Sequence, residues 1–148
     1  MRYQLIFFAF ILSLLGGCVG TGLDYSRANY QLNNSSGDQL YLLRKLGWLC
    51  SACVFPVYLN GTSIGQIGEK ETLIGNLASG NNNLRIKPNS RLGGFMLGTL
   101  LQNSSFESIF HEKGENRFFI ISLDSRSLKD TIMLVEVSEE VWRAKARR

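Results

Sequence analysis

The sequence predicts an all-β protein, folded as an antiparallel β-sandwich of about seven or eight short strands. Short runs of apolar, aromatic and β-branched residues recur at intervals of about ten residues, separated by clusters of Gly, Asn and Ser. Asn60-Gly61 lies between two such runs, and this dipeptide is typical of a two-residue hairpin turn because both of its residues tolerate a positive φ. The periodicity of a helix is nearly absent from the body of the chain.

A single sandwich domain is expected over residues 39–138. Its first strand is predicted at 39–45, and the segment 54–68, VFPVYLNGTSIGQIG, has the pattern of a hairpin closed by Asn60-Gly61. We expect 71–77 and 83–88 to form the next pair, joined by the turn-rich ASGNNN. Further strands are predicted at 104–112, 116–124 and 131–138.

The last residues, 139–148, predict a short basic helix. Ser138 suits the N-cap, and Glu139 and Glu140 complement the positive N-terminal end of the helix. The basic tail from Arg143 to Arg148 is expected to be a solvated helix end or, alternatively, to rest on anionic lipid headgroups.

The first residues, 1–17, are typical of a signal peptide. Arg2 precedes an apolar run from Leu5 to Leu15. A run of about 11 residues is too short to cross the roughly 30 Å hydrocarbon core of a membrane as a helix, and it has the length of a signal helix.

The end of this run, Leu15-Gly16-Gly17-Cys18, resembles the lipobox of bacterial lipoproteins. In a lipobox the small pair enters the peptidase groove, and the cysteine thiol accepts the lipid. The alternative is an ordinary signal peptide followed by a chance cysteine. The resemblance implies lipidation at Cys18, and more than one acyl chain makes a stable membrane anchor. Val19 stands where inner-membrane lipoproteins typically carry aspartate, which favours the outer membrane, facing the periplasm.

A flexible, lipid-anchored tether is expected over 18–38. This segment is rich in Gly, Ser and Asn and shows no period. About twenty such residues would hold the domain roughly 25 Å from the membrane anchor. Tyr25 and Tyr30 offer contacts by which part of the segment could dock.

Cys50 and Cys53, in GWLCSACV, form a C-x-x-C pair that admits three interpretations. In an oxidising periplasm a structural disulfide is the ordinary fate of two neighbouring thiols. Unbridged packing in or beside a strand is the second. A redox pair is the third, but such a pair needs its first cysteine at the start of a helix, and the β run VFPVYLNG follows here.

The sequence predicts neither an enzyme nor a cofactor or metal site. His111 is the sole histidine, and only two cysteines accompany Cys18, so no set of four zinc ligands is available. The chain carries 16 Lys and Arg against 12 Asp and Glu, a net charge of +4. Without Arg2 the surplus is smaller still, so we expect no nucleic-acid partner and no small-molecule substrate.

An apolar, glycine-containing segment at 92–101, LGGFMLGTLL, is the remaining candidate contact surface. It is expected either to cover the end of the sandwich or to meet a partner or the lipid surface. The residues that would make this contact are Phe95, Met96, Leu97, Leu100 and Leu101.

The order LYLLRKLGWLCSACVFPVYLNGTSIGQIG resembles the bacterial lipoprotein family that carries domain of unknown function 2846. Arg44, Gly61 and Ile64-Gly65 fall on the family's pattern, whereas Ala78-Ser79-Gly80 departs from its usual proline-glycine. The resemblance covers about 39–140. It implies an immunoglobulin-like sandwich on a lipid anchor without known catalytic residues, and it places Cys50 and Cys53 where the family has small residues.

The expected function is therefore non-catalytic: a periplasm-facing cell-envelope lipoprotein that acts as a binding or structural module. Its expected partners are the membrane, through the lipid anchor, and an envelope protein or glycan. The alternatives are a membrane-anchored thiol–disulfide oxidoreductase that uses Cys50 and Cys53, and a peptidoglycan-associated structural lipoprotein.

Overall fold

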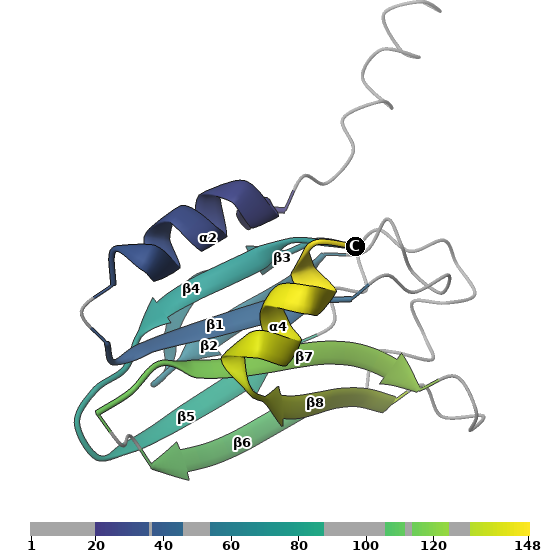
Figure 1. Ribbon diagram of the computed structural model, residues 1–148. Helices are drawn as coiled ribbons and strands as arrows, with labels where there is room; N and C mark the ends of the chain where they lie inside the picture. The colour runs from purple at the N-terminus through teal and green to yellow at the C-terminus, as the bar shows by residue number, and fades with distance from the viewer. Residues whose placement is uncertain (1–19, 36, 46–53, 88–105, 112–113, 125–130) are drawn as a thin grey trace, which may run out of the picture.

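The computed structural model is a sandwich of two four-stranded β-sheets (Figure 1). It describes residues 20–35, 37–45, 54–87, 106–111, 114–124 and 131–148. The first sheet has the order β4 (Thr72–Asn76), β1 (Gln39–Arg44), β7 (Arg117–Asp124) and β8 (Thr131–Val137). The second has the order β3 (Thr62–Ile67), β2 (Phe55–Leu59), β5 (Asn81–Ile86) and β6 (Phe106–His111). The predicted all-β sandwich is confirmed.

Seven of the eight strands fall within a segment that the sequence predicts as a strand, whereas β5 begins at Asn81, inside the predicted turn and two residues before the predicted strand. The predicted hairpin turn is confirmed. Asn60 and Gly61 have φ values of 53° and 79°, as a two-residue primed turn requires. The Asn60 side chain also bonds to β5: its Oδ1 accepts from the Asn83 backbone N–H at 2.8 Å, and its Nδ2 donates to Asn82 Oδ1 at 2.8 Å. The turn therefore fixes β5 beside β2.

The expected pairing of 71–77 with 83–88 is wrong, because these strands belong to different sheets. β4 pairs with β1, whereas β5 pairs with β2 and β6. The connection is held by the buried Asn82, whose side chain bonds to Ala78 N, Ala78 O and Gly80 O. These bonds hold the loop that carries the chain from the first sheet to the second.

One pairing also differs from a wholly antiparallel sandwich. β1 and β7 run parallel, with Tyr41 opposite Phe118 and Leu42 opposite Phe119. In immunoglobulin constant domains the first strand lies beside the second, whereas β1 here lies between β4 and β7. The likeness to an immunoglobulin domain thus concerns the two-layer architecture and not the strand order.

The main core lies between the two sheets. Alternate residues of each strand point inward, so Leu40 and Leu42 of β1 face Phe55 and Val57 of β2 across the interior. The other buried members of this inner core are Leu59, Ile67, Leu73, Leu84, Ile86, Phe119, Ile121 and Ile132. β3 also lies against β4 and β6 against β8, so the two layers meet along both edges.

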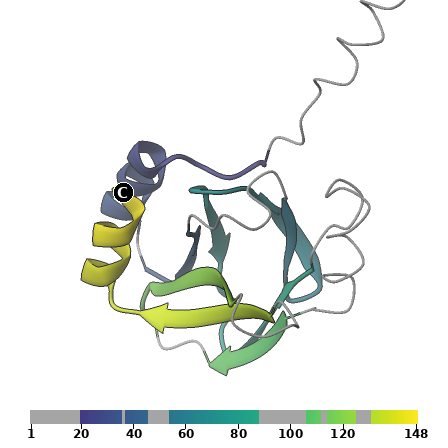
Figure 2. The ribbon, with the colours of Figure 1, turned by 90° about the vertical axis from the view of Figure 1, so that its right-hand side faces the viewer.

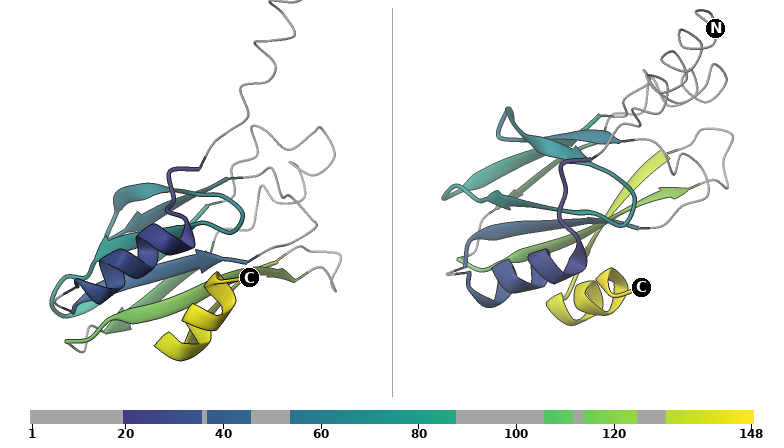
Figure 3. Two further views of the ribbon diagram at one scale, coloured as in Figure 1. Left: turned by 45° about the horizontal axis from the view of Figure 1, so that its top comes forward. Right: turned by 90° about the horizontal axis from the view of Figure 1, so that it is seen from above.

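Two helices cover the outer face of the first sheet, α2 (Tyr25–Asn33) and α4 (Glu139–Ala146). They lie on the same side of the sandwich, so that helices, first sheet and second sheet form three layers (Figures 2 and 3). A second apolar cluster, the outer core, fills the space beneath them. Its buried members are Ala28, Leu32, Tyr41, Leu43, Phe118, Ile120 and Trp142.

Helix α2 corrects the expectation of a flexible tether over 18–38. Asp24 caps it, accepting the Arg27 N–H at 2.9 Å, and this bond lowers the pKa of the Asp24 carboxyl below its usual value. Ala28 and Leu32, one turn apart, are buried against the sheet. Of the two tyrosines that offered contacts, Tyr25 packs against the outer core, whereas Tyr30 is 71% exposed. The side chains of Ala28 and Leu32 thus hold an otherwise polar helix against the first sheet.

Helix α4 confirms the predicted C-terminal helix and its cap. Ser138 Oγ accepts the Val141 N–H at 3.4 Å, and Glu139 and Glu140 occupy the first turn. Trp142 is fully buried, with its ring 5.7 Å from that of Tyr41 and 5.8 Å from that of Phe118. The indole therefore fastens α4 to the first sheet.

Truncating this indole should destabilise the fold. We expect Trp142→Ala to lower the free energy of unfolding by about 3–5 kcal/mol, because it empties the centre of the outer core. Trp142→Phe should cost much less, since it keeps the aromatic body and removes an Nε1 donor that has no hydrogen-bond partner in the described chain. Urea unfolding measures both. Equal losses for the two variants would contradict this account of the packing.

Candidate functional site

The segment Gly20–Leu23 lies directly on the sandwich, at the edge where β3 and β4 meet. Leu23 N–H donates to Thr72 O at 2.7 Å, and Thr72 N–H donates to Leu23 O at 2.8 Å. Thr21 N–H donates to Gln66 O at 2.8 Å. We call the segment Gly20–Leu23 the N-terminal seat. Since Thr72 belongs to the first sheet and Gln66 to the second, it joins both layers at one end of the sandwich.

The Glu71 carboxylate holds the seat in place. Its Oε2 accepts the N–H of Gly68 at 2.7 Å and the N–H of Gly22 at 3.2 Å. The approach is so close that a Cβ on Gly22 would lie 2.6 Å from Glu71 Cβ, and a Cβ on Gly20 would clash with the carboxylate. Gly65, at φ 140°, sits beside the register shift in β3 and leaves room for Thr21.

The seat limits the distance between the sandwich and a lipid on Cys18. Gly20 follows Cys18 by two residues, and two residues span at most about 7 Å. An acyl anchor on Cys18 would therefore enter the membrane beside this end of the sandwich, which we call the anchor end. The roughly 25 Å reach of an unstructured tether does not apply.

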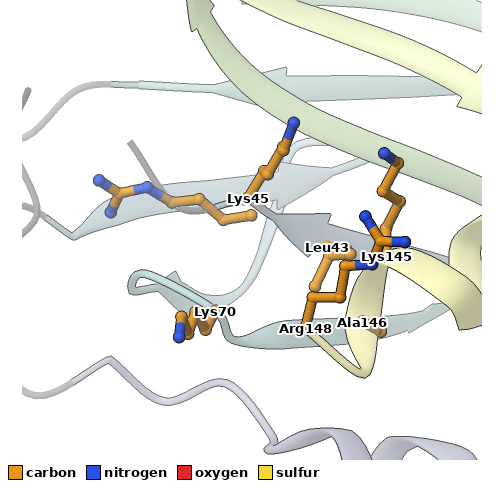
Figure 4. A pocket seen from close by; sticks show the side chains of 7 residues that line it. Leu43, Lys45, Lys70, Lys145, Ala146 and Arg148 are labelled. Atoms are coloured by element: carbon orange, nitrogen blue, oxygen red, sulfur yellow. The ribbon is translucent and has the colours of Figure 1, made fainter. Parts of the chain in front are cut away.

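A basic pocket opens at the same end. It has a volume of about 230 Å³ and is built from three parts of the chain: the end of β1, the turn between β3 and β4, and the end of α4 (Figure 4). Its lining consists of Leu43, Arg44, Lys45, Lys70, Lys145, Ala146 and Arg148. Five of these seven side chains are cationic, and none is acidic.

Arg44 is the buried cation among the residues that line the basic pocket. Its guanidinium lies 4.2 Å from the centre of the Phe55 ring, and its Nη1 donates to Ile67 O at 3.5 Å. Burial lowers the pKa of Arg44, and the carboxylates of Glu69 and Glu71 oppose that shift. Arg44 is thus compensated within the fold.

The other four cations have no such compensation. Among the described residues, none forms an ion pair with Lys45, Lys70, Lys145 or Arg148. The turn also connects the basic pocket to the seat, because Lys70 precedes Glu71 in the chain and its N–H donates to Arg44 O at 3.0 Å. The carboxylate that holds the N-terminal segment and the cations of the pocket are therefore parts of one local structure.

The far end of the first sheet carries the opposite charge. The start of β7, the end of β8 and the start of α4 meet there, and the groove between them contains Glu115, Glu136 and Glu139. Arg117 is buried at this end and pairs with Glu136. Arg143 pairs with Glu139 in the same way. Three carboxylates thus stand against two paired arginines at this end, a small negative surplus, whereas the anchor end has four cations without an ion pair in the described chain.

The outer face of the second sheet lies away from both helices of the described chain (Figure 3). A hollow of about 250 Å³ on this face is lined by Tyr58, Gly61, Asn83, Arg85 and Lys87. Arg85 pairs with Glu107 at 3.0 Å, and Asn83 Nδ2 donates to the same carboxylate at 2.7 Å. These two bonds lower the pKa of Glu107. Most of the polar groups here already bind one another, unlike the four cations of the basic pocket.

Several predicted site residues lie outside the described residues. They are Leu15, Gly16, Gly17 and Cys18 of the lipobox, Cys50 and Cys53 of the candidate disulfide, and Phe95, Met96, Leu97, Leu100 and Leu101 of the apolar segment. The basic tail divides: Arg143 bonds to Asn29 and Asn33 of α2, Arg147 bonds to Tyr25, and Lys145 and Arg148 enter the basic pocket. Only this tail gave a sequence signal for the pocket, since Lys45 follows a single arginine and Lys70 lies between two glutamates, and neither belongs to a longer basic run.

Neither helix of the described chain has the length and apolar character needed to cross a membrane. Comparisons of the chain with protein-family models, with curated proteins and with solved structures find no match. The resemblance to the lipoprotein family with a domain of unknown function therefore stays a prediction.

The seat should not tolerate a side chain at Gly22. We expect Gly22→Ala to lower the free energy of unfolding by about 1–3 kcal/mol, because its Cβ must displace Glu71. Hydrogen exchange at the Leu23 and Thr72 amides, which bond to each other's carbonyl groups, should accelerate in the same variant. Gln31→Ala on the exposed face of α2 is the control. Unchanged exchange at these two amides would contradict the close contact.

Proposed function

We propose that this chain is a non-catalytic lipoprotein of the bacterial cell envelope, anchored through Cys18, whose sandwich stands directly against the membrane surface. The seat of Gly20–Leu23 carries the proposal: because it lies on the sandwich and Cys18 is only two residues before Gly20, a lipid on Cys18 would lie within about 7 Å of the anchor end. The lipobox Leu15–Cys18 supplies the lipidation signal, and Val19 favours the outer membrane, facing the periplasm. In this position the chain acts as a binding or structural module at the membrane surface.

The position of β2 supports a non-catalytic role for Cys50 and Cys53. A redox C-x-x-C depends on a helix that begins at its first cysteine and continues beyond the second. Here Phe55 already belongs to β2, two residues after Cys53. The strand occupies the place where that helix would continue, which favours packing or a structural disulfide for the two cysteines.

The lipid anchor has a direct test. In bacteria fed an alkyne-bearing palmitate, we expect the natural chain to be labelled and Cys18→Ser to lose the label completely, because the thiol is the attachment point. Cys18→Ser should also keep its leader and migrate as a larger band. Cys50→Ser, which leaves the lipobox intact, is the control and should be labelled normally. A labelled Cys18→Ser variant, or an unlabelled natural chain, would refute the anchor.

The non-catalytic role is tested by thiol trapping of the full chain across a graded dithiothreitol series. We expect Cys50 and Cys53 either to remain unbridged or to form a disulfide with a potential below about −300 mV, as structural disulfides do. A reversible potential between about −270 and −120 mV would instead place the pair among the oxidoreductases. That outcome would refute the non-catalytic assignment but would not affect the proposal of a lipid anchor.

A further inference from the structure

We propose that the basic pocket binds the phosphate of an anionic phospholipid headgroup, taken from the membrane that holds Cys18. This inference rests on the proposed function, since the anchor supplies the membrane. It adds a ligand class and a set of ligand-binding residues: Lys45, Lys70, Lys145 and Arg148.

The position of the basic pocket carries the first step. Glu71 binds Gly22 of the N-terminal seat, and its neighbour Lys70 lines the pocket. A lipid on Cys18 lies within about 7 Å of Gly20, so the bilayer surface must pass close to the turn that contains both residues. Headgroups of the anchoring membrane are therefore the nearest abundant anions to the pocket.

The chemistry of the lining carries the second step. Lys45 directly follows β1, Lys145 and Arg148 lie at the end of α4, and Lys70 lies in the turn between β3 and β4 (Figure 4). All four line the basic pocket. Ammonium and guanidinium groups are the usual ligands of phosphate oxygens, and the apolar Leu43 and Ala146 suit the carbon atoms of a glycerol backbone. A volume of about 230 Å³ accommodates a headgroup of this kind.

The nearby carboxylates do not neutralise this opening. Glu71 is engaged by the N–H groups of Gly68 and Gly22, and Glu69 acts on the buried Arg44. Asp24 caps α2 and lies within 4.0 Å of Arg27. None of these three carboxylates lines the basic pocket. Its four exposed cations therefore have no acidic partner in the described chain.

The charge asymmetry carries the third step. An anionic membrane attracts the four cations of the anchor end, whereas the opposite end, where arginines pair with two of the three carboxylates, offers no such attraction. The covalent anchor and the electrostatic field therefore favour the same orientation. In that orientation the basic pocket faces the lipid headgroups.

Lysine acetylation of the full chain in vesicles tests the proposal. The chain is reconstituted in phosphatidylcholine vesicles, with or without about 30 mol% phosphatidylglycerol, at about 0.15 M salt. After flotation, a limiting acetylating reagent is added and each lysine is quantified by mass spectrometry. We expect the acetylation rates of Lys45, Lys70 and Lys145 to fall roughly fivefold with the anionic lipid. This factor corresponds to the attraction of one basic residue to an anionic membrane surface. Lys87, which belongs to the hollow beside Tyr58, is the internal reference and should react at an unchanged rate.

Matched double variants locate the effect. Lys45→Gln with Lys145→Gln should abolish the protection of Lys70, because two of the four phosphate-binding cations are gone. Arg27→Gln with Arg85→Gln removes the same charge outside the basic pocket, keeps Lys87 as the internal reference and should leave Lys70 protected. Circular dichroism checks that both variants fold, and the pattern in the natural chain stands without them.

Each other outcome overturns the assignment in a distinct way. Equal protection of Lys87 would indicate diffuse attraction to the surface and no pocket. Protection by inorganic phosphate in neutral vesicles, as strong as that by the anionic lipid, would assign the pocket to a free phosphate and overturn the lipid source. An absence of protection in both arms would overturn phosphate binding altogether. Failure of the anchor is recognised separately, because the chain would then not float with either kind of vesicle.

Discussion

The parallel pair of β1 and β7 is the constraint on which the rest of the structure depends. Both strands are buried on both faces, as parallel strands usually are. On the inner face Leu42 and Phe119 enter the core between the sheets. On the outer face the rings of Tyr41 and Phe118 stack 5.2 Å apart and present an apolar surface that water would otherwise cover. Burying each such side chain contributes about 1.5–3 kcal/mol, so this outer face demands a cover.

The cover explains why the chain before β1 is not a tether. α2 and α4 share the task, and the side chain of Arg143 in α4 bonds to Asn33 in α2 at 2.9 Å. For α2 to lie on the sheet, the preceding residues must pass along the edge where β3 meets β4, and there Glu71 binds them. The position of the N-terminal segment is thus a consequence of the outer core: α2 must shield Tyr41 and Phe118, and it brings Gly20–Leu23 onto the sandwich. With the anchor that we propose on Cys18, a module built in this way would stay at the membrane surface.

The sequence predicted the strands well because their signals are local. Asn60-Gly61 needs only its own two φ values, and Ser138 needs only the helix that follows it. Two other features were missed because their signals are not local. Ala28 and Leu32 are the only buried residues of α2, and so short a stripe in a polar composition does not stand out as a helix face. The sequences of β1 and β7 contain no signal for parallel pairing with a strand some 75 positions away, because this pairing depends on which faces must be buried.

The candidate site was missed for the same physical reason. A surplus of four positive charges over 148 residues argues against nucleic acid but says nothing about where the charges lie. Lys45 follows a strand, Lys70 lies in a turn and Lys145 ends a helix, so only the tertiary fold assembles them. Trp142 links this assembly to the core, because Lys145 is one turn beyond it on α4 and Ala146 packs on the outer core. The indole that shields Tyr41 and Phe118 therefore also sets the position of the cations, and the charge of the basic pocket depends on the same packing that holds the third layer in place.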